Sequence, residues 1–504
     1  MPARQDRRRA APGRQDGSQR RSGPGRRPGA SRSGLPRRTA YDVLAAVDDR
    51  AAYANLLLPR LLADRAISGR DAALATELAY GTLRGQGSYD AVLAACSDRP
   101  LGKLDPPVLR VLRLGAHQLL ATRVGAHAAV ATSVDLAKDV AGPRVSGYVN
   151  AVLRRVSTRD LDAWLAIVAP DPDTDPDGHL AVRYSYPRWI VAAYREALGD
   201  AGDDELESAL AAGNDRPRVT MAAFPAGRAR DEIMPDSAMP TQWSPYGFTL
   251  PGGDPSSLIA AGQATVQDEG SQLAAIALAG VPVDGPDSLW LDMCAGPGGK
   301  ARLLYGLART TQARMVAADI HQHRAALIED ALAGTSRPGT TPARFGSTGG
   351  SDTTAYAVVV ADGRRPPWSD GAFDRVLVDV PCSGLGALRR RPEARWRKSE
   401  ADLPPLAALQ RDLLGSAIAA CRPGGVIGYV TCSPVPAETR DVVTAVVGSA
   451  ADAEILDAPA MLSAVPGVRS ASPLFAQLWP HRHGTDAIFI ALLRRGTHIA
   501  EREA

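Results

Sequence analysis

The sequence of 504 residues has few cysteines and no long apolar run. Its five cysteines are an odd number and none forms a Cys-x-x-Cys pair, which argues against a disulfide framework and against a structural zinc site. We therefore expect reduced thiols and no bound metal. No apolar run approaches the ~20 residues that cross a membrane, and no hydrophobic signal segment opens the chain. These absences predict a cytoplasmic protein without a membrane partner.

The charge of the chain is unevenly distributed. The formal net charge is +3, but residues 1–38 contain twelve Arg and two Asp, so the remainder is mildly acidic. Residues 1–36 are also rich in Gly, Pro and Ser, which predicts a disordered leader. A basic leader attracts polyanions, and two interpretations remain open for it, a solvated extension or a contact with RNA.

The pattern along the chain predicts three folded parts between the leader and a short tail at 498–504. Apolar residues at spacings of three and four predict an all-helical domain over 37–160. Residues 161–255 are mixed and predict a small connecting domain that includes a strand at 218–224. From 256 to 497, short apolar strands alternate with helices, as is typical of a parallel sheet covered on both faces.

A glycine loop follows one of these strands and precedes a helix, in LDMCAGPGGKA at 291–301. Glycines allow a tight turn, and the backbone amides of a helix start favour an anionic or carboxylate-bearing ligand. Asp319 ends the next strand, where an acid can bind both ribose hydroxyls of an adenosine cofactor. Both NAD and S-adenosylmethionine fit these residues, and a plain tight turn is the alternative.

Two cysteines leave the sheet at the ends of apolar strands. Cys382 follows Asp379 in LVDVPC, and Cys432 follows the strand GYVT. Ligands of such sheets bind at the carboxyl ends of the strands, so we expect both thiols on the same edge as Asp319 and Asp362. A thiolate that adds to carbon 6 of a pyrimidine makes carbon 5 nucleophilic toward a methyl donor. A carboxyl group at the ring and a second thiol for product release would complete that chemistry. Taken singly, each thiol is more often an inert core residue, as we expect for Cys96 and for Cys421, placed on a helix.

The segment RRRPEARWRK at 389–398 is strongly basic and contains one tryptophan. Cations for phosphates and a ring for stacking predict an RNA-binding rim. A solvated basic loop is the alternative. A stacked base would have to be flipped out before a thiol could reach it.

At these residues the chain resembles the RsmB/Sun/Fmu family of bacterial 16S ribosomal RNA (cytosine-5)-methyltransferases, within the NOL1/NOP2/Sun group. The resemblance covers nearly all of 38–495, and its helical part resembles NusB-like RNA-binding domains. The motifs that carry it are VQDEGSQLAA (266–275), LDMCAGPGGKA (291–301), AADIHQHR (317–324), VLVDVPCSGLGALRRRPEARWRK (376–398) and GYVTCSPVPAE (428–438).

The resemblance implies an all-α NusB-like N-terminal domain and an α/β Rossmann-like class I methyltransferase domain with a mostly parallel seven-stranded sheet. It implies that Cys432 is the nucleophile, that Cys382 assists product release and that Asp379 lies close to methyl donor and base. Asp319 would bind the ribose of S-adenosyl-L-methionine, and Asp362 would lie near its adenine. The rest of the cofactor would be held by Cys294, Ala295, Gly296, Pro297, Gly298, Gly299 and Lys300, with Asp379 beside them. At Gly296 the family usually has alanine, which is a mild departure.

The expected partner is small-subunit ribosomal RNA, and we expect a monomer. Three alternatives remain open from the sequence: methylation of a cytosine in transfer RNA or large-subunit ribosomal RNA, a non-catalytic RNA-binding assembly protein, and a nicotinamide-dependent oxidoreductase. The sequence does not decide the target nucleotide, or whether the substrate is naked RNA or a partly assembled ribosomal particle.

Overall fold

The computed structural model describes residues 34–252, 255–334, 356–449 and 452–496. The predicted tail at 498–504 and all but the end of the predicted leader lie outside these ranges. The first helix begins at Leu35, inside the last residues assigned to the leader. Within the described ranges, no helix has the length and apolar character needed to cross a membrane.

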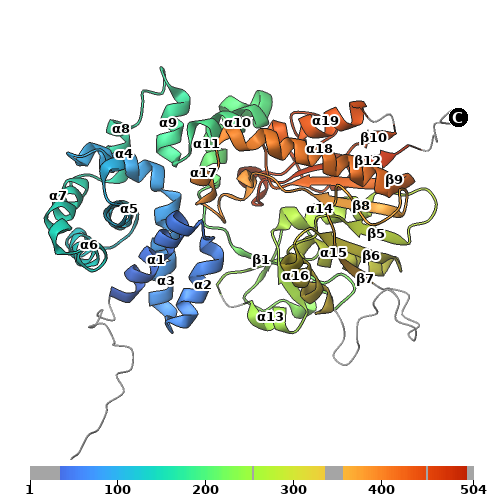
Figure 1. Cartoon of the computed structure of the whole chain (residues 1–504), viewed down its shortest axis with the longest axis horizontal. Coiled ribbons are helices and arrows are strands. Elements are labelled where there is room, and N and C mark those ends of the chain that lie inside the picture. Colours follow the sequence, from blue (N-terminus) through green and yellow to red (C-terminus); the bar gives the residue numbers. More distant parts are fainter. Residues whose placement is uncertain (1–33, 253–254, 335–355, 450–451, 497–504) are drawn as a thin grey trace, which may run out of the picture.

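The first part of the chain is helical, as predicted (Figure 1). Two prolines open the helix that begins at Pro106, where the missing backbone N–H groups cost nothing, and its apolar stripe fills the core with Val108, Val111 and Leu112. The helices are α1 (Leu35–Arg50), α2 (Ala54–Asp64), α3 (Gly69–Arg84), α4 (Gln86–Cys96), α5 (Pro106–Ala121), α6 (Ala126–Ala141), α7 (Ser146–Val156) and α8 (Leu161–Val168).

A connecting region follows, with helices and a small antiparallel sheet. The helices are α9 (Pro176–Tyr184), α10 (Arg188–Leu198) and α11 (Gly202–Ala212). The sheet has the order β2-β3-β1-β4 and consists of β1 (Val219–Ala223), β2 (Met239–Pro240), β3 (Gly247–Leu250) and β4 (Ala264–Val266), with the short helices α12 (Arg230–Ile233) and α13 (Ser256–Ala260) beside it. The predicted strand at 218–224 is confirmed as β1. The partner strand β4 lies beyond residue 255, where the sequence had placed the end of this region.

The large sheet has the strand order β10-β12-β9-β8-β5-β6-β7, with β11 paired to β12. Five strands are parallel: β5 (Leu289–Asp292), β6 (Arg314–Asp319), β7 (Tyr356–Val360), β8 (Phe373–Asp379) and β9 (Cys421–Thr431). The antiparallel strands are β10 (Ala453–Leu456), β11 (Ala476–Gln477) and β12 (Phe489–Arg495). The predicted, mostly parallel sheet is confirmed.

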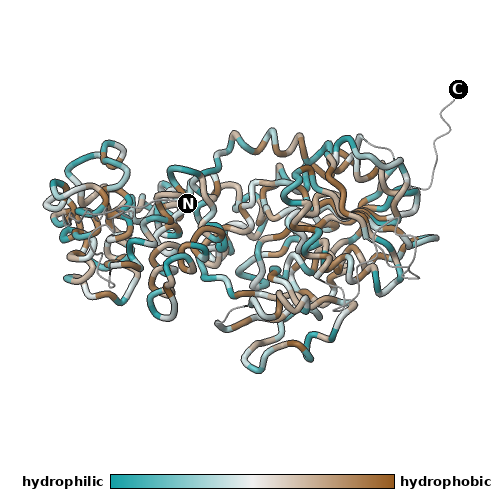
Figure 2. Tube along the Cα trace, turned by 60° about the horizontal axis from the view of Figure 1, so that its bottom comes forward, coloured by the Kyte–Doolittle hydropathy of each residue, from teal (hydrophilic) through white to brown (hydrophobic). Residues whose placement is uncertain are grey.

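Helices cover both faces of this sheet (Figure 1). On one face, α14 (Glu269–Gly280), α15 (Gly299–Thr310) and α16 (Gln322–Ala333) share a core with the strands. On the other face, α18 (Leu403–Ala420) and α19 (Arg440–Ser449) form a second core layer. The short helices α17 (Ala394–Arg397) and α20 (Pro480–His483) lie in connections. Hydrophobic residues are concentrated along the strands between the two layers (Figure 2). Cys421 is buried as expected, but it begins β9 rather than ending a helix, because α18 stops at Ala420.

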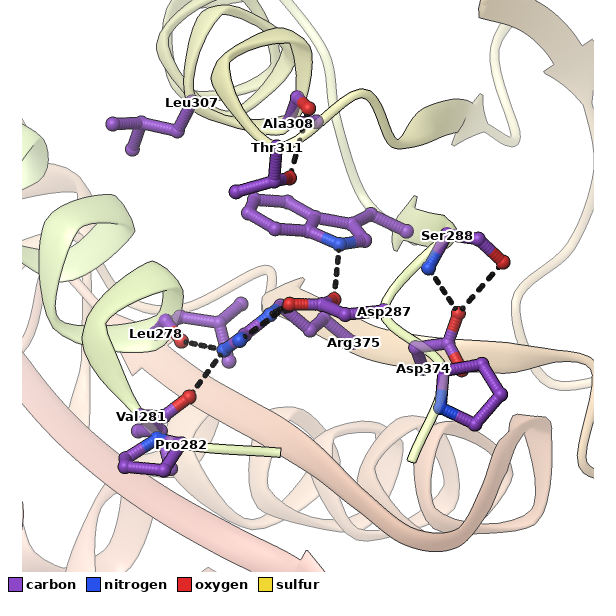
Figure 3. Close-up of polar contacts among 12 residues, drawn as sticks. Leu278, Val281, Pro282, Asp287, Ser288, Leu307, Ala308, Thr311, Asp374 and Arg375 are labelled. Atoms are coloured by element: carbon purple, nitrogen blue, oxygen red, sulfur yellow. Dashed lines mark hydrogen bonds and ion pairs between the residues drawn. The ribbon is translucent and has the colours of Figure 1, made fainter. Parts of the chain in front are cut away.

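A partly buried ion pair fixes the amino-terminal edge of the sheet (Figure 3). Arg375, near the start of β8, donates to both carboxyl oxygens of Asp287 at 2.7–3.0 Å. It also donates to the carbonyls of Leu278 and Val281 at 2.8 Å. The indole N–H of Trp290 reaches the same Asp287 at 2.6 Å. This one guanidinium therefore ties the end of α14 to β5 and β8, on the edge opposite the candidate site.

The basic segment 389–398 is a joint between the parts of the chain. Arg389 lies 2.5 Å from Asp486 and 2.8 Å from Asp268, and Arg390 lies 2.7 Å from Asp268 and 2.9 Å from Asp486. All four side chains are buried or half-buried, so they form a closed four-charge cluster. Both arginines form ion pairs with neighbouring carboxylates and are not free to bind phosphate.

The continuation of this segment docks on the ends of two helices. Glu393 accepts the backbone N–H of Ala54, the first residue of α2, at 3.2 Å. Arg397 donates to the carbonyls of Val47 and Ala51 at the end of α1, at 3.0 and 3.1 Å. An acid at a helix start and a base at a helix end both complement the helix dipole.

Arg395 lies between these two contacts and is fully buried. Its guanidinium lies 4.0 Å from the ring centroid of Tyr186 and donates to the Ser185 carbonyl and the Asn214 side chain at 2.9 and 2.8 Å. The predicted RNA-binding rim is therefore wrong for Arg389, Arg390, Arg395 and Arg397, and so is the alternative of a solvated loop. Charge composition alone does not tell a phosphate ligand from a cation that docks on backbone carbonyls.

Candidate active site

The glycine loop joins β5 to the start of α15. A side chain at Gly296 would place its Cβ 2.4 Å from a carboxyl oxygen of Asp319 and 2.8 Å from the Cβ of Arg324. The loop therefore passes directly over the end of β6, and the Gly296 N–H donates to Asp319 at 3.2 Å. Gly298 has φ +108°, a left-handed conformation that glycine adopts without strain. These contacts bring the loop and the predicted ribose-binding acid together.

Asp319 and Asp362 lie at the carboxyl ends of neighbouring strands, as predicted. Asp319 ends β6 and accepts the backbone N–H of His321 at 2.8 Å. Asp362 follows β7 and pairs with Arg364 at 2.7 Å. The hydrogen bond from Arg364 holds the pKa of Asp362 below its usual value. The edge thus presents two acids beside a loop of backbone amides, a donor and acceptor set that suits the amino acid, ribose and base of an adenosyl cofactor.

Three ionisable groups lie close together where β5 and β8 end. Lys300, in the first turn of α15, lies 2.9 Å from Asp379. Burial lowers the pKa of the Lys300 ammonium, but the charge and hydrogen bond of Asp379 outweigh this effect and raise it. Asp292, at the end of β5, is fully buried, and within the described chain no side chain donates a hydrogen bond to its carboxyl group. Burial, followed by the charge of Asp379, raises the pKa of Asp292 to about 8.

The sequence analysis included Asp292 only within the loop motif and assigned it no role. It also did not predict the ion pair between Lys300 and Asp379. An acid at the end of a fully apolar strand was the available signal for Asp292. Cys294, two residues on, is half-buried, and burial raises the pKa of its thiol, which keeps it protonated. Among the residues that the structure describes, no group of three or more His, Cys, Asp or Glu side chains is arranged to hold a metal ion.

The two predicted thiols lie together at the same edge. Cys432 directly follows β9, and Cys382 lies three residues beyond the end of β8, which pairs with β9 in parallel. Their sulfur atoms are 3.2 Å apart, and both side chains are half-buried. The Gly386 N–H donates to the Cys432 carbonyl at 2.8 Å and so joins the two loops.

The surroundings make the two thiols chemically different. The hydrogen bond between the two thiols lowers the pKa of Cys432, and the positive charges of Lys300 and Arg391 act in the same direction against burial and Asp379. The same hydrogen bond, together with burial, raises the pKa of Cys382. Because the thiolate is the nucleophilic form, this arrangement favours Cys432 as nucleophile and Cys382 as a proton-bearing neighbour.

Comparisons with known proteins agree with this geometry. The family described as 16S rRNA methyltransferase RsmB/F matches residues 281–494, and the NusB family matches residues 35–158. A Pseudomonas putida protein named ribosomal RNA small subunit methyltransferase B is 31% identical over 466 residues, which cover 91% of this chain and 98% of that protein. The chain belongs to the RsmB/F methyltransferase family.

Other relatives extend over the same length. A Mycobacterium tuberculosis (strain H37Rv) protein is named a methyltransferase, and its name states no substrate. It is 47% identical to this RsmB/F chain over 470 residues, which cover 92% of this chain and 96% of the M. tuberculosis protein. The crystal structure of PH0851 matches with a TM-score of 0.71 and 21% identity over 92% of this chain and 98% of that chain, which shows a shared fold.

Membership in the RsmB/F family confirms the resemblance, the fold class and the cofactor inferred from the sequence. The chain is an S-adenosylmethionine-dependent RNA methyltransferase. The glycine loop, the edge acids and the unpaired buried carboxyl of Asp292 form a cradle that fits this cofactor. Neither a nicotinamide-dependent oxidoreductase nor a non-catalytic assembly protein agrees with this membership.

Proposed function

We propose that this enzyme transfers a methyl group to carbon 5 of a cytosine in 16S ribosomal RNA through a covalent adduct between Cys432 and carbon 6. The observation that carries the proposal is the 3.2 Å pair of sulfur atoms at the carboxyl ends of neighbouring parallel strands. The Lys300–Asp379 pair at the same edge and the small-subunit name of the P. putida relative support it.

In this mechanism the Cys432 thiolate forms a bond to carbon 6, and the electrons of the 5,6 double bond move toward carbon 5. The Lys300 ammonium offsets the negative charge that builds on the ring, and Asp379 holds that ammonium in place. Carbon 5 then takes the methyl group that S-adenosylmethionine supplies as a sulfonium. The carbon 5 proton then passes to solvent and its electron pair restores the 5,6 double bond. The bond from carbon 6 to sulfur breaks with its electron pair on sulfur, which restores the aromatic ring and the Cys432 thiolate. Cys382, beside the leaving sulfur, assists this release.

The remaining edge residues are assigned to cofactor binding. Residues 294–300 hold the methionine part through backbone amides, because the start of α15 leaves N–H groups without helical partners. Asp319 binds the ribose hydroxyls. Asp362 lies near the adenine once its side chain leaves Arg364.

We expect Cys432→Ala to abolish methyl transfer while S-adenosylmethionine still binds, because the nucleophile is lost and the cradle is not. The measurement is transfer of tritium from labelled cofactor to 16S ribosomal RNA, with bisulfite mapping to locate the modified base. Cys96→Ala is the matched control, since this buried cysteine ends α4 and packs in the core of the helical part. Residual turnover in Cys432→Ala near that of the control would refute the assignment.

We expect Cys382→Ala to accumulate a covalent protein–RNA adduct, because addition and methylation proceed while release is impaired. The adduct is seen as a slower band in denaturing gels and disappears in the Cys382→Ala, Cys432→Ala double variant. Normal turnover without an adduct would contradict the division of labour between the thiols. Methylation of transfer RNA or large-subunit RNA in place of 16S RNA would correct the substrate and leave the mechanism standing.

A further inference from the structure

A serine directly follows each of the two cysteines, and both serines contact one carboxyl group. The Ser383 hydroxyl and the Ser433 hydroxyl donate to the same oxygen of Glu438 at 2.5 and 2.7 Å. The Ser383 backbone N–H donates to the other oxygen at 2.7 Å. One side chain is thus hydrogen-bonded to both loops that carry the reactive sulfurs.

Glu438 is fully buried, and its acceptor capacity is filled. A fourth donor, the amide of Gln410, reaches its first oxygen at 3.2 Å and also binds the carbonyl of Pro381, the residue before Cys382, at 2.9 Å. Two carboxylate oxygens offer about four acceptor positions, and burying such a group is favourable only when it is well hydrogen-bonded. The network is therefore closed, and a change in one donor disturbs the others.

We infer that Glu438 is a positioning residue that sets the separation and relative orientation of the Cys382 and Cys432 sulfurs. It contacts the serines and not the sulfurs, so it acts through the two loops. For its chemical consequence the inference rests on the proposed function, in which one sulfur attacks while the other waits beside it. Displacing a catalytic group by 1 Å can cost about a hundredfold in rate, so an anchor shared by both loops matters for catalysis.

The test compares Glu438→Gln with Tyr429→Phe. The amide places a donor where the carboxylate accepted two hydroxyls, while Tyr429→Phe removes the hydrogen bond to the Glu438 main-chain carbonyl, 2.7 Å long, and leaves the carboxyl group intact. The first measurement is the pH dependence of alkylation of each cysteine by iodoacetamide, resolved by peptide mass spectrometry. The second separates kcat from the KM for S-adenosylmethionine.

For Glu438→Gln we expect kcat to fall by about ten- to a hundredfold with the KM within about twofold. The alkylation midpoint of Cys432 should rise toward the ~8.5 of a free thiol, so that the two cysteines react alike. Tyr429→Phe should keep the wild-type alkylation profile. Ser383→Ala should give part of the same shift and add nothing when combined with Glu438→Gln, because both break one network.

Unchanged kcat and an unchanged alkylation profile in Glu438→Gln would overturn the inference. An equal shift in Tyr429→Phe would also overturn it, by reducing the role of Glu438 to general packing. If Glu438→Gln fails to bind cofactor or to fold, Ser383→Ala and Ser433→Ala decide, and wild-type profiles in both refute the inference. A wild-type enzyme without methyl transfer to RNA would refute the proposed function alone, because alkylation of Cys432 is read without turnover.

Discussion

We expect Asp292→Asn to be more stable than wild type without cofactor, and we expect this difference in the free energy of unfolding to grow as the pH rises. The carboxyl group is fully buried without a side-chain hydrogen-bond partner in the described chain. Burial and then the charge of Asp379 raise its pKa to about 8, against the smaller opposing effects of Lys300 and the Cys294 backbone. In the unfolded chain an aspartate titrates near pH ~3.9. Between these values the folded protein holds a proton that the unfolded chain has released.

The sign and size of the effect follow from this difference. Because the folded state binds more protons, the free energy of unfolding falls as the pH rises from about 4 to about 8, by at most ~1.4 kcal/mol per pH unit. Asparagine resembles the neutral carboxyl group in shape and does not titrate. The stability difference between variant and wild type should therefore grow by up to ~2.7 kcal/mol between pH 6 and pH 8 and level off above.

Urea unfolding without cofactor, at five values from pH 5 to pH 9 and followed by tryptophan fluorescence, measures this difference. Asp362→Asn is the matched control: the hydrogen bond from Arg364 lowers the pKa of Asp362, so that carboxylate is ionised in both states over this range and its replacement adds no slope. A stability difference for Asp292→Asn that stays constant from pH 5 to pH 9 would refute the assignment of a protonated, buried Asp292.

Two further predictions concern the loop and the far edge of the sheet. Gly296→Ala should weaken S-adenosylmethionine binding about tenfold in isothermal titration, although the family usually has alanine at this position. In this chain the added Cβ would lie 2.4 Å from the Asp319 carboxyl and 2.8 Å from the Cβ of Arg324, and overpacking of this kind costs about 1–3 kcal/mol; unchanged affinity would show that these neighbours move aside without loss of binding. Arg375→Met should lower the free energy of unfolding by about 3 kcal/mol, because Asp287 loses its guanidinium, while cofactor affinity stays the same; a loss under about 1 kcal/mol would contradict the importance of the cluster in Figure 3.

The sequence predicted the site's edge because the relevant signals are local. An apolar strand followed by glycine or proline marks where the chain leaves a parallel sheet, and the rule that ligands bind at carboxyl ends brought Asp319, Asp379 and both thiols to one edge. The pairing of Lys300 with Asp379 joins residues 79 positions apart, and no periodicity reports such a contact. The hydrogen-bond network of Glu438 was not predicted for the same reason, although Ser383 and Ser433 directly follow Cys382 and Cys432 in the sequence.

The misread basic segment shows where composition fails. Its cations were expected to contact phosphate groups of RNA. In the structure, carboxylates and the backbone carbonyls at the end of a helix provide negative partners of the same kind. Backbone carbonyls at the end of α1 attract Arg397, as a phosphate oxygen would. Only the three-dimensional arrangement distinguishes these partners, and within 389–398 only the side chain of Arg391 is exposed to solvent.

This joint also makes the helical part a structural component of the active site. The segment that carries Cys382 continues through Arg389 and Arg390, which two carboxylates hold on the side of the sheet. It then reaches Glu393, which contacts the start of α2, and Arg397, which contacts the end of α1. The acid lies at a helix start and the base at a helix end, so the two charges favour one orientation of the segment against α1 and α2. In the reverse orientation each charge would face the helix end that carries the same sign of partial charge. The loop of Cys382 is therefore held from both sides, by the hydrogen bonds of Ser383 to Glu438 and by the contacts of the continuing segment with α1 and α2.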